Sequence, residues 1–123
     1  MIGFALVLVG AAIGAPARYL LDRSIQARHE SLMPWGTMSV NLAGSAVLGL
    51  LGGLAAEHAI PHNLLLLIGT GLSGSFTTFS TYSYETMRLY QTRARTQALL
   101  NLAVTITAGL GTVIIGYAIG TGL

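Results

Sequence analysis

Residues 64–90 read LLLLIGTGLSGSFTTFSTYSYETMRLY, and this stretch decides the fold. It is apolar enough to cross a bilayer, but as one unbroken helix it would be about 40 Å long against a hydrocarbon core of about 30 Å. Its middle is rich in Gly, Ser and Thr, which favour irregular backbone over a lipid-facing helix. We therefore expect a membrane-spanning helix that is broken near residues 74–78.

Other apolar stretches of similar length lie at residues 2–21, 35–56 and 98–119. The chain is 53% hydrophobic and only 8% charged, whereas soluble domains carry about 25% charged residues. Each crossing of a bilayer needs about 20 mostly apolar residues, so four crossings use nearly the whole chain. The sequence predicts an all-α membrane protein in which residues 1–123 form one integral membrane domain with four transmembrane helices.

Glycine recurs at intervals that let helices approach closely in lipid. The pattern G-x-x-x-G occurs in the first and fourth spans, and the second span has several glycines on at least one side. These positions are Gly10 and Gly14, Gly116 and Gly120, and Gly44, Gly49, Gly52 and Gly53. We expect the glycine faces to pack against protein rather than lipid.

The basic side chains are all arginines, and they flank only the first and third loops. They are Arg18, Arg23 and Arg28 around the first loop, and Arg88, Arg93 and Arg95 around the third. The positive-inside rule places these loops in the cytoplasm and both ends of the chain outside. Arginines spread in this way form no continuous basic stripe, so we expect no nucleic-acid partner.

Two further patterns have ordinary explanations. Residues 69–74 match G-x-G-x-x-G, but they lie within a membrane span and open no βαβ unit, so helix packing explains them better than nucleotide binding. His58 and His62 are four residues apart, but Pro61 interrupts any helix that would align them. Together with His29, they are expected to be interfacial and solvated, because no further ligands lie nearby and the chain has no cysteine.

Polar side chains within the spans have two interpretations. Asn41 lies in the second span, while Asn101, Thr105 and Thr112 share one face of the fourth at helical spacing. They either hold helices together by hydrogen bonds or offer donors along the path of an anion. Glu85 either pairs with the arginine three residues further on or stands at the mouth of such a path.

The expected helix break concentrates hydroxyl groups and aromatic rings between Gly74 and Tyr82. A broken helix in lipid leaves backbone N–H and C=O groups unpaired, and protein, water or an ion must meet them. Backbone carbonyl oxygens without a hydrogen-bond donor are suited to bind a small cation. Aromatic ring edges carry partial positive charge, so Phe79 and Tyr82 are suited to present their edges to an anion.

Three motifs in order give the chain a family resemblance. They are Gly10-Ala-Ala-Ile-Gly14 leading to Arg18-Tyr19, Pro34-Trp35-Gly36-Thr37 leading to Val40-Asn41, and Gly74-Ser-Phe-Thr-Thr-Phe-Ser-Thr81 leading to Glu85. With these motifs, nearly the whole chain resembles the bacterial fluoride channel family, also known by the camphor-resistance name CrcB.

The resemblance implies an obligate antiparallel, dual-topology dimer of four-helix subunits with two fluoride pores. It also implies a structural, untransported Na⁺ ion on the dimer axis, held by the backbone carbonyls of Gly74 and Thr77. The residues expected to line or shape the pore are Asn41, Phe79, Ser80, Thr81, Tyr82 and Thr105, with Arg18 and Glu85 at the vestibule or mouth. The chain departs from the usual family pattern at Tyr82, Asn101 and Gly109.

The implied function is passive export of fluoride from the cytoplasm across the cell membrane, by a channel and not by an enzyme. One alternative is a small multidrug exporter, but that chemistry needs a carboxylate within the membrane and the first span has no acid before Asp22. The other is an accessory membrane subunit that transports nothing itself.

The sequence leaves two forms of dimer open for this chain. A dual-topology homodimer needs copies facing both ways, yet the arginine bias predicts a single orientation. We therefore hypothesise a heterodimer with a related subunit of opposite bias, with the antiparallel homodimer as the alternative.

Overall fold

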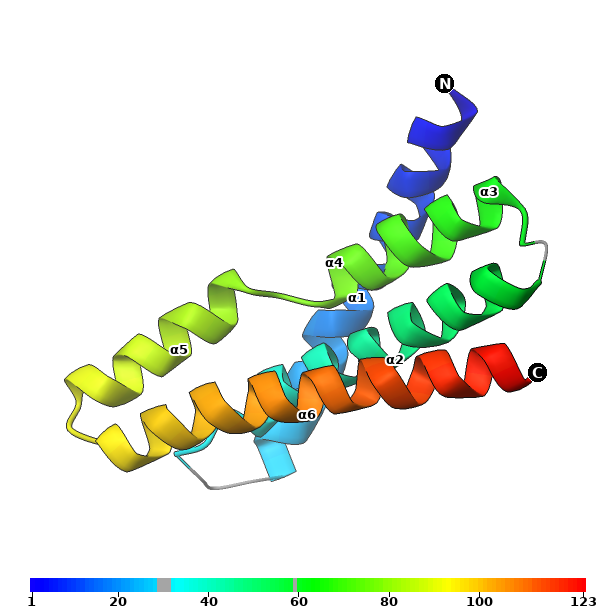
Figure 1. Ribbon diagram of the computed structural model, residues 1–123. Helices are drawn as coiled ribbons and strands as arrows, with labels where there is room; N and C mark the ends of the chain where they lie inside the picture. Colours follow the sequence, from blue (N-terminus) through cyan, green and yellow to red (C-terminus); the bar gives the residue numbers. More distant parts are fainter. Residues whose placement is uncertain (29–31, 59) are drawn as a thin grey trace.

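The computed structural model describes residues 1–28, 32–58 and 60–123. In chain order its helices are α1 (Ile2–Arg28), α2 (Trp35–Glu57), α3 (His62–Leu64), the π-helical η1 (Leu65–Ser73), α4 (Gly74–Phe76), α5 (Ser80–Gln91) and α6 (Arg95–Gly122). Four helical segments are long and apolar enough to cross a membrane: Ile2–Arg28, Trp35–Glu57, His62–Gln91 and Arg95–Gly122. The prediction of an all-helical chain with four spans is confirmed (Figure 1).

The first helix is longer than the apolar pattern indicates. It continues past residue 21 to Arg28, and Pro16 lies inside it. Residues 22–28 are mostly polar but contain no glycine or proline, so the helix continues beyond the apolar segment. His29, for which an interfacial position was expected, lies outside the described residues.

The third span is interrupted at residues 77–79, where the chain runs extended between α4 and α5 (Figure 1). Thr77 has φ −81° and ψ 158°, outside the helical range. The break overlaps the predicted segment 74–78, but the first half-helix continues through Phe76, so the interruption is shorter and later. The G-x-G-x-x-G pattern lies within η1 and α4, as helix rather than a nucleotide loop.

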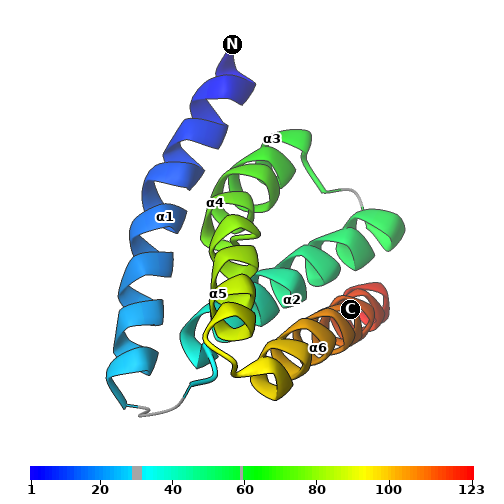
Figure 2. The same cartoon turned by 90° about the vertical axis from the view of Figure 1, so that its left-hand side faces the viewer.

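Helices α2 and α6 lie side by side and run in the same direction (Figures 1 and 2). A methyl group on Gly116 would meet the Ala46 carbonyl oxygen at 2.6 Å, and one on Gly120 would meet the Leu50 carbonyl oxygen at 2.5 Å. Gly49 and Gly53 lie equally close to the backbone of α6. The predicted close approach at these glycines is therefore confirmed.

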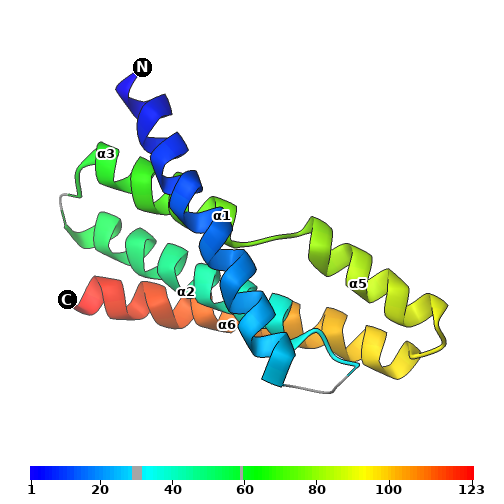
Figure 3. The same ribbon diagram turned by 180° about the vertical axis from the view of Figure 1, so that it is seen from behind.

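Helix α1 crosses the other helices at a large angle, as the view from behind shows (Figure 3). It packs against the first half of the third span through glycines on both sides. A Cβ on Gly71 would meet the Cα of Gly10 at 3.0 Å, and one on Gly14 would collide with Ser75 and Leu72. The G-x-x-x-G pattern of the first span thus fixes the first half of the broken helix.

The two arginine-flanked connections lie at the same end of the helix bundle, where α1 and α5 end and α2 and α6 begin (Figure 2). At this end the Arg95 guanidinium lies 4.9 Å from the centre of the Tyr90 ring, a cation–π geometry suited to the membrane interface. The cytoplasmic placement of this end stays a prediction.

Replacing Gly116 with alanine should destabilise the protein, because the added methyl group collides with the backbone of α2. Overpacking of this kind costs about 1–3 kcal/mol. Gly122→Ala is the matched control in the same helix, since nothing lies within 4 Å of its Cβ position. We expect a lower apparent melting temperature in detergent for Gly116→Ala only. Equal melting temperatures for both variants would show that the α2–α6 contact is looser than described.

Candidate functional site

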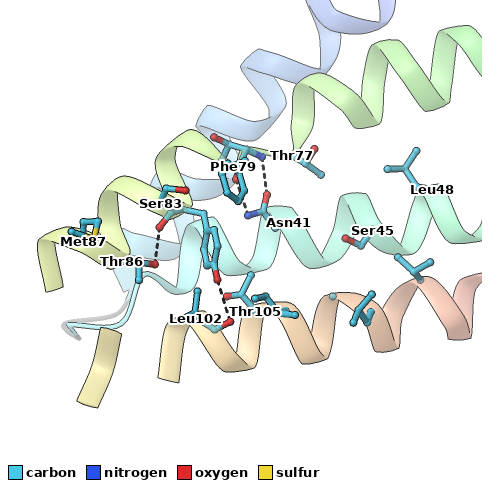
Figure 4. A pocket seen from close by; sticks show the side chains of 16 residues that line it. Asn41, Ser45, Leu48, Thr77, Phe79, Ser83, Thr86, Met87, Leu102 and Thr105 are labelled. Atoms are coloured by element: carbon cyan, nitrogen blue, oxygen red, sulfur yellow. Dashed lines mark hydrogen bonds between the residues drawn. The ribbon is translucent and has the colours of Figure 1, made fainter. Parts of the chain in front are cut away.

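A groove of about 790 Å³ lies between α2, α5 and α6, directly beside the break of the third span. Polar side chains line it on all three sides, from Asn41 and Ser45 on α2, Ser83 and Thr86 on α5, and Thr105 on α6. Figure 4 shows these side chains around the extended segment that carries Thr77 and Phe79. Apart from Thr77 and Thr78 in this segment, the remaining lining is aliphatic and aromatic. We call this the α2–α5–α6 groove.

Asn41 bonds to the broken backbone with both ends of its amide. Its Nδ2 donates to the Thr78 carbonyl oxygen at 2.9 Å, and its Oδ1 accepts from the Thr78 N–H at 2.7 Å (Figure 4). A bidentate pair of this kind mimics the backbone bonds that the break removes. Asn41 therefore holds the interruption open while it lines the groove.

Hydroxyl groups satisfy other backbone groups around the break. The Thr78 Oγ1 accepts from the Thr81 N–H at 3.2 Å, which caps the start of α5. On the other side, the hydroxyls of Ser75 and Thr77 donate to the carbonyls of Gly71 and Ser73 at 2.7 and 3.1 Å. In lipid no water is available to bond these backbone groups, so the small hydroxyl residues lower the free-energy cost of the break.

A second chain of hydrogen bonds joins α5 to α6 along the groove. The Thr86 hydroxyl donates to the Tyr82 carbonyl at 2.8 Å and accepts from Asn101 Nδ2 at 2.8 Å. The Thr105 hydroxyl donates to Asn101 Oδ1 at 3.3 Å. Asn101 is 1% exposed, so its role in the structure is interhelical. Thr112 donates only within its own helix, to the Gly109 carbonyl at 2.9 Å.

The two aromatic residues beside the break differ in their surroundings. Phe79 precedes α5 and is 79% exposed, while Tyr82 is 6% exposed. Their ring centres are 6.0 Å apart with the planes inclined by 53°. The Tyr82 hydroxyl donates to the Leu102 carbonyl at 3.1 Å, so in this structure its proton is directed to α6 and only the ring lines the groove.

Most of the predicted site residues line two neighbouring cavities. Asn41, Phe79, Tyr82 and Thr105 line the α2–α5–α6 groove, together with Thr77. Arg18 and Thr81 line a cavity of about 150 Å³ between α1, α2 and the break.

Three of the predicted residues, Gly74, Ser80 and Glu85, do not line these cavities. Ser80 is exposed, with its hydroxyl 3.4 Å from that of Thr78. Glu85 faces another hollow near the start of α2, and it makes no ion pair with Arg88 within the described part of the chain.

Several lining residues were missed by the sequence reasoning. Ser45 follows Asn41 by four residues and Thr86 follows Tyr82 by four. Helical spacing puts each pair on one face, and this signal could have identified both residues. Thr78 gave no comparable signal, because its role depends on contact with α2. Among the described residues, no group of three or more His, Cys, Asp or Glu side chains gathers to hold a metal ion.

The geometry defines a class of protein. Within a membrane, non-helical backbone is tolerated only where protein buries it or where it lines a cavity, and such breaks are typical of ion channels and transporters. Here the break lies beside a groove with hydroxyl and amide groups. The chain is thus a small integral membrane protein built for the passage of an ion.

Comparisons with known proteins identify the family. The family described as "CrcB-like protein, Camphor Resistance (CrcB)" matches residues 5–117. The protein "Fluoride-specific ion channel FluC 1" of Streptomyces avermitilis is 49% identical over 90% of both chains. Its namesake in Frankia casuarinae is 45% identical over 93% of this chain and 92% of the relative. "Fluoride-specific ion channel FluC" of Magnetococcus marinus is 41% identical over 93% and 94%.

The chain belongs to the CrcB/FluC family of fluoride-specific ion channels. Membership confirms the resemblance drawn from the three motifs, and with it the prediction of a membrane-embedded ion channel rather than an enzyme. The similarity covers all four spans, including the break.

Asn41→Ala should destabilise the break, because it leaves the Thr78 N–H and C=O without partners at a cost of roughly 1–3 kcal/mol for each buried group. We expect faster hydrogen exchange at residues 77–81 and a lower melting temperature. Asn63→Ala, at an exposed position in α3, is the control. If exchange at the break is unchanged in Asn41→Ala, the amide bridge does not hold the interruption.

Proposed function

We propose that this chain is one subunit of a fluoride-selective channel that passively exports fluoride from the cytoplasm and so confers fluoride resistance. The observation that supports this most strongly is the α2–α5–α6 groove at the break of the third span. It presents hydroxyl and amide groups but no fixed positive charge, and the relatives of the chain carry the name of fluoride-specific channels.

The chemistry of the groove suits an anion that must pass rather than bind. A small anion loses water when it enters, and donors without full charge replace part of that hydration without trapping the ion. The edges of the Phe79 and Tyr82 rings carry partial positive charge at the same place. We assign the pathway to Asn41, Phe79, Ser80, Thr81, Tyr82 and Thr105, with Arg18 and Glu85 at its mouth.

No energy source beyond the membrane potential is needed. Fluoride enters cells as uncharged HF in acid surroundings and dissociates inside, where the anion is trapped. An interior-negative potential drives one negative charge outward with about 2.3 kcal/mol per 100 mV. A passive pore is therefore sufficient for resistance.

A structural Na⁺ ion, bound by the backbone carbonyls of Gly74 and Thr77, is part of the proposal. In a continuous helix these carbonyls would accept from the N–H groups of Thr78 and Thr81. Those donors bond instead to Asn41 Oδ1 and Thr78 Oγ1, so the two carbonyls are released for another partner. A bound Na⁺ would supply positive charge to the break without being transported.

We propose that the working unit is a dimer of two oppositely oriented subunits. The groove is open along the exposed Phe79 side, and a second subunit would enclose it. The arginines flank only the connections at one end of the bundle, which favours a single orientation for this chain. A related subunit with the opposite bias is therefore the favoured partner, and a second copy of this chain is the alternative.

The test is fluoride efflux from sodium-containing liposomes reconstituted with this chain alone, measured with a fluoride electrode beside a chloride control. Fast release selective for fluoride supports a channel and a working homodimer. If this chain alone gives no efflux, and efflux begins when a related subunit of opposite arginine bias is added, the result supports the channel and the heterodimer. No fluoride efflux with both subunits present contradicts the channel proposal.

Loss of hydroxyl groups at the break should slow efflux if they line the pathway. Ser80→Ala and Thr81→Val remove one hydroxyl each, and the Thr81 N–H that bonds to Thr78 stays in place. We expect at least tenfold slower efflux for the double variant in liposomes where the wild type is active. Thr121→Val, near the end of α6, is the control. Unchanged efflux in the double variant would show that these hydroxyls do not line the pathway, and where efflux needs a partner subunit it would favour an accessory role for this chain.

A further inference from the structure

Among the residues that the structure describes, three buried oxygen atoms lie without hydrogen-bond partners where α1, α2 and α5 meet. They are Asp22 Oδ1, Thr37 Oγ1 and Glu85 Oε1. All three accept hydrogen bonds, and only the Thr37 hydroxyl carries a proton to donate when both acids are ionised. Buried acceptors without donors are costly, most of all when they belong to carboxylates.

The three side chains converge on the first turn of α2. Asp22 Oδ1 lies so close to Gly36 that a Cβ there would collide with it, which shows why glycine precedes Thr37. Thr37 is 1% exposed and lines the 150 Å³ cavity together with Asp22. From the other side, Glu85 lies beside the Thr37 hydroxyl without meeting hydrogen-bond geometry, and it interacts electrostatically with Asp22.

Nearby positive charges do not neutralise this cluster directly. Arg18 interacts with Asp22 and Arg88 with Glu85 over longer range, but within the described ranges neither acid forms an ion pair. The first turn of α2 adds partial positive charge on the same side. With two arginines at longer range and a helix N-terminus nearby, the two carboxylates leave little net negative charge, so a monovalent cation suits the site better than a divalent ion.

We propose that Asp22, Thr37 and Glu85 bind one small monovalent cation, a proton or a sodium ion, at the arginine-rich end of the helix bundle. The cation bridges the two carboxylates, and the Thr37 oxygen completes its contacts. This site is separate from the backbone carbonyls of Gly74 and Thr77, because its ligands are side chains. A bound cation also lowers the negative charge near Arg18, beside the path that an anion would take.

Infrared spectroscopy of the reconstituted protein tests this site without any transport assay. The chain has only four acidic side chains, so carboxyl bands are few, and ions bound to backbone carbonyls do not alter them. A protonated-carboxyl band at neutral pH that disappears in both Asp22→Asn and Glu85→Gln identifies a shared proton. Carboxylate bands that shift when N-methylglucamine is exchanged for Na⁺, and do not shift in these variants, identify sodium.

Glu57→Gln is the matched control, because Glu57 is exposed at the opposite end of α2, and it should keep either signal. The amide bands in the same spectra report whether each variant retains its helices, and Thr37→Val provides a milder change if a charge variant misfolds. The absence of a protonated-carboxyl band, together with wild-type carboxylate bands that do not shift between N-methylglucamine and Na⁺, would overturn the proposal, since water in the cavity would then satisfy the carboxylates.

Discussion

The pairing of Asn41 with the backbone of Thr78 is the interaction on which the rest of the structure depends. A helix that stops inside a bilayer leaves donors and acceptors that water cannot reach, and each one must be met by the protein. One side-chain amide meets two of them at 2.9 and 2.7 Å. Because this amide belongs to α2, the break is held against a neighbouring helix, and α5 leaves in the direction that opens the groove.

The small residues of the chain follow from the same constraint. Glycines let α1 and α6 approach the backbones of their neighbours, which fixes the helices on either side of the break. The hydroxyls of Ser75 and Thr77 donate to carbonyls at the end of the first half-helix, and the Thr78 hydroxyl accepts from an N–H at the start of α5. The same hydroxyl and amide groups are the polar part of a largely apolar groove. The bonds that stabilise the broken backbone and the proposed passage of an anion therefore use one set of side chains.

The sequence predicted features that depend on local pattern or on lipid. The length of the apolar stretches predicted the four spans, and the excess length of residues 64–90 predicted the break. The spacing of the glycines predicted the close helix contacts. The position of the break at 77–79 was not predicted, since it depends on which amide on α2 lies opposite. The direction of the Tyr82 hydroxyl toward Leu102, and the meeting of Asp22, Thr37 and Glu85, equally depend on contacts between distant segments.

The most direct test of the central claim is the reversal potential of the purified channel in a planar bilayer. Sodium and chloride are equal on both sides, and gluconate replaces fluoride on one side. If the groove beside the break conducts fluoride selectively, the current reverses at the fluoride equilibrium potential. A current that reverses at zero would show that other ions carry it and would contradict the account.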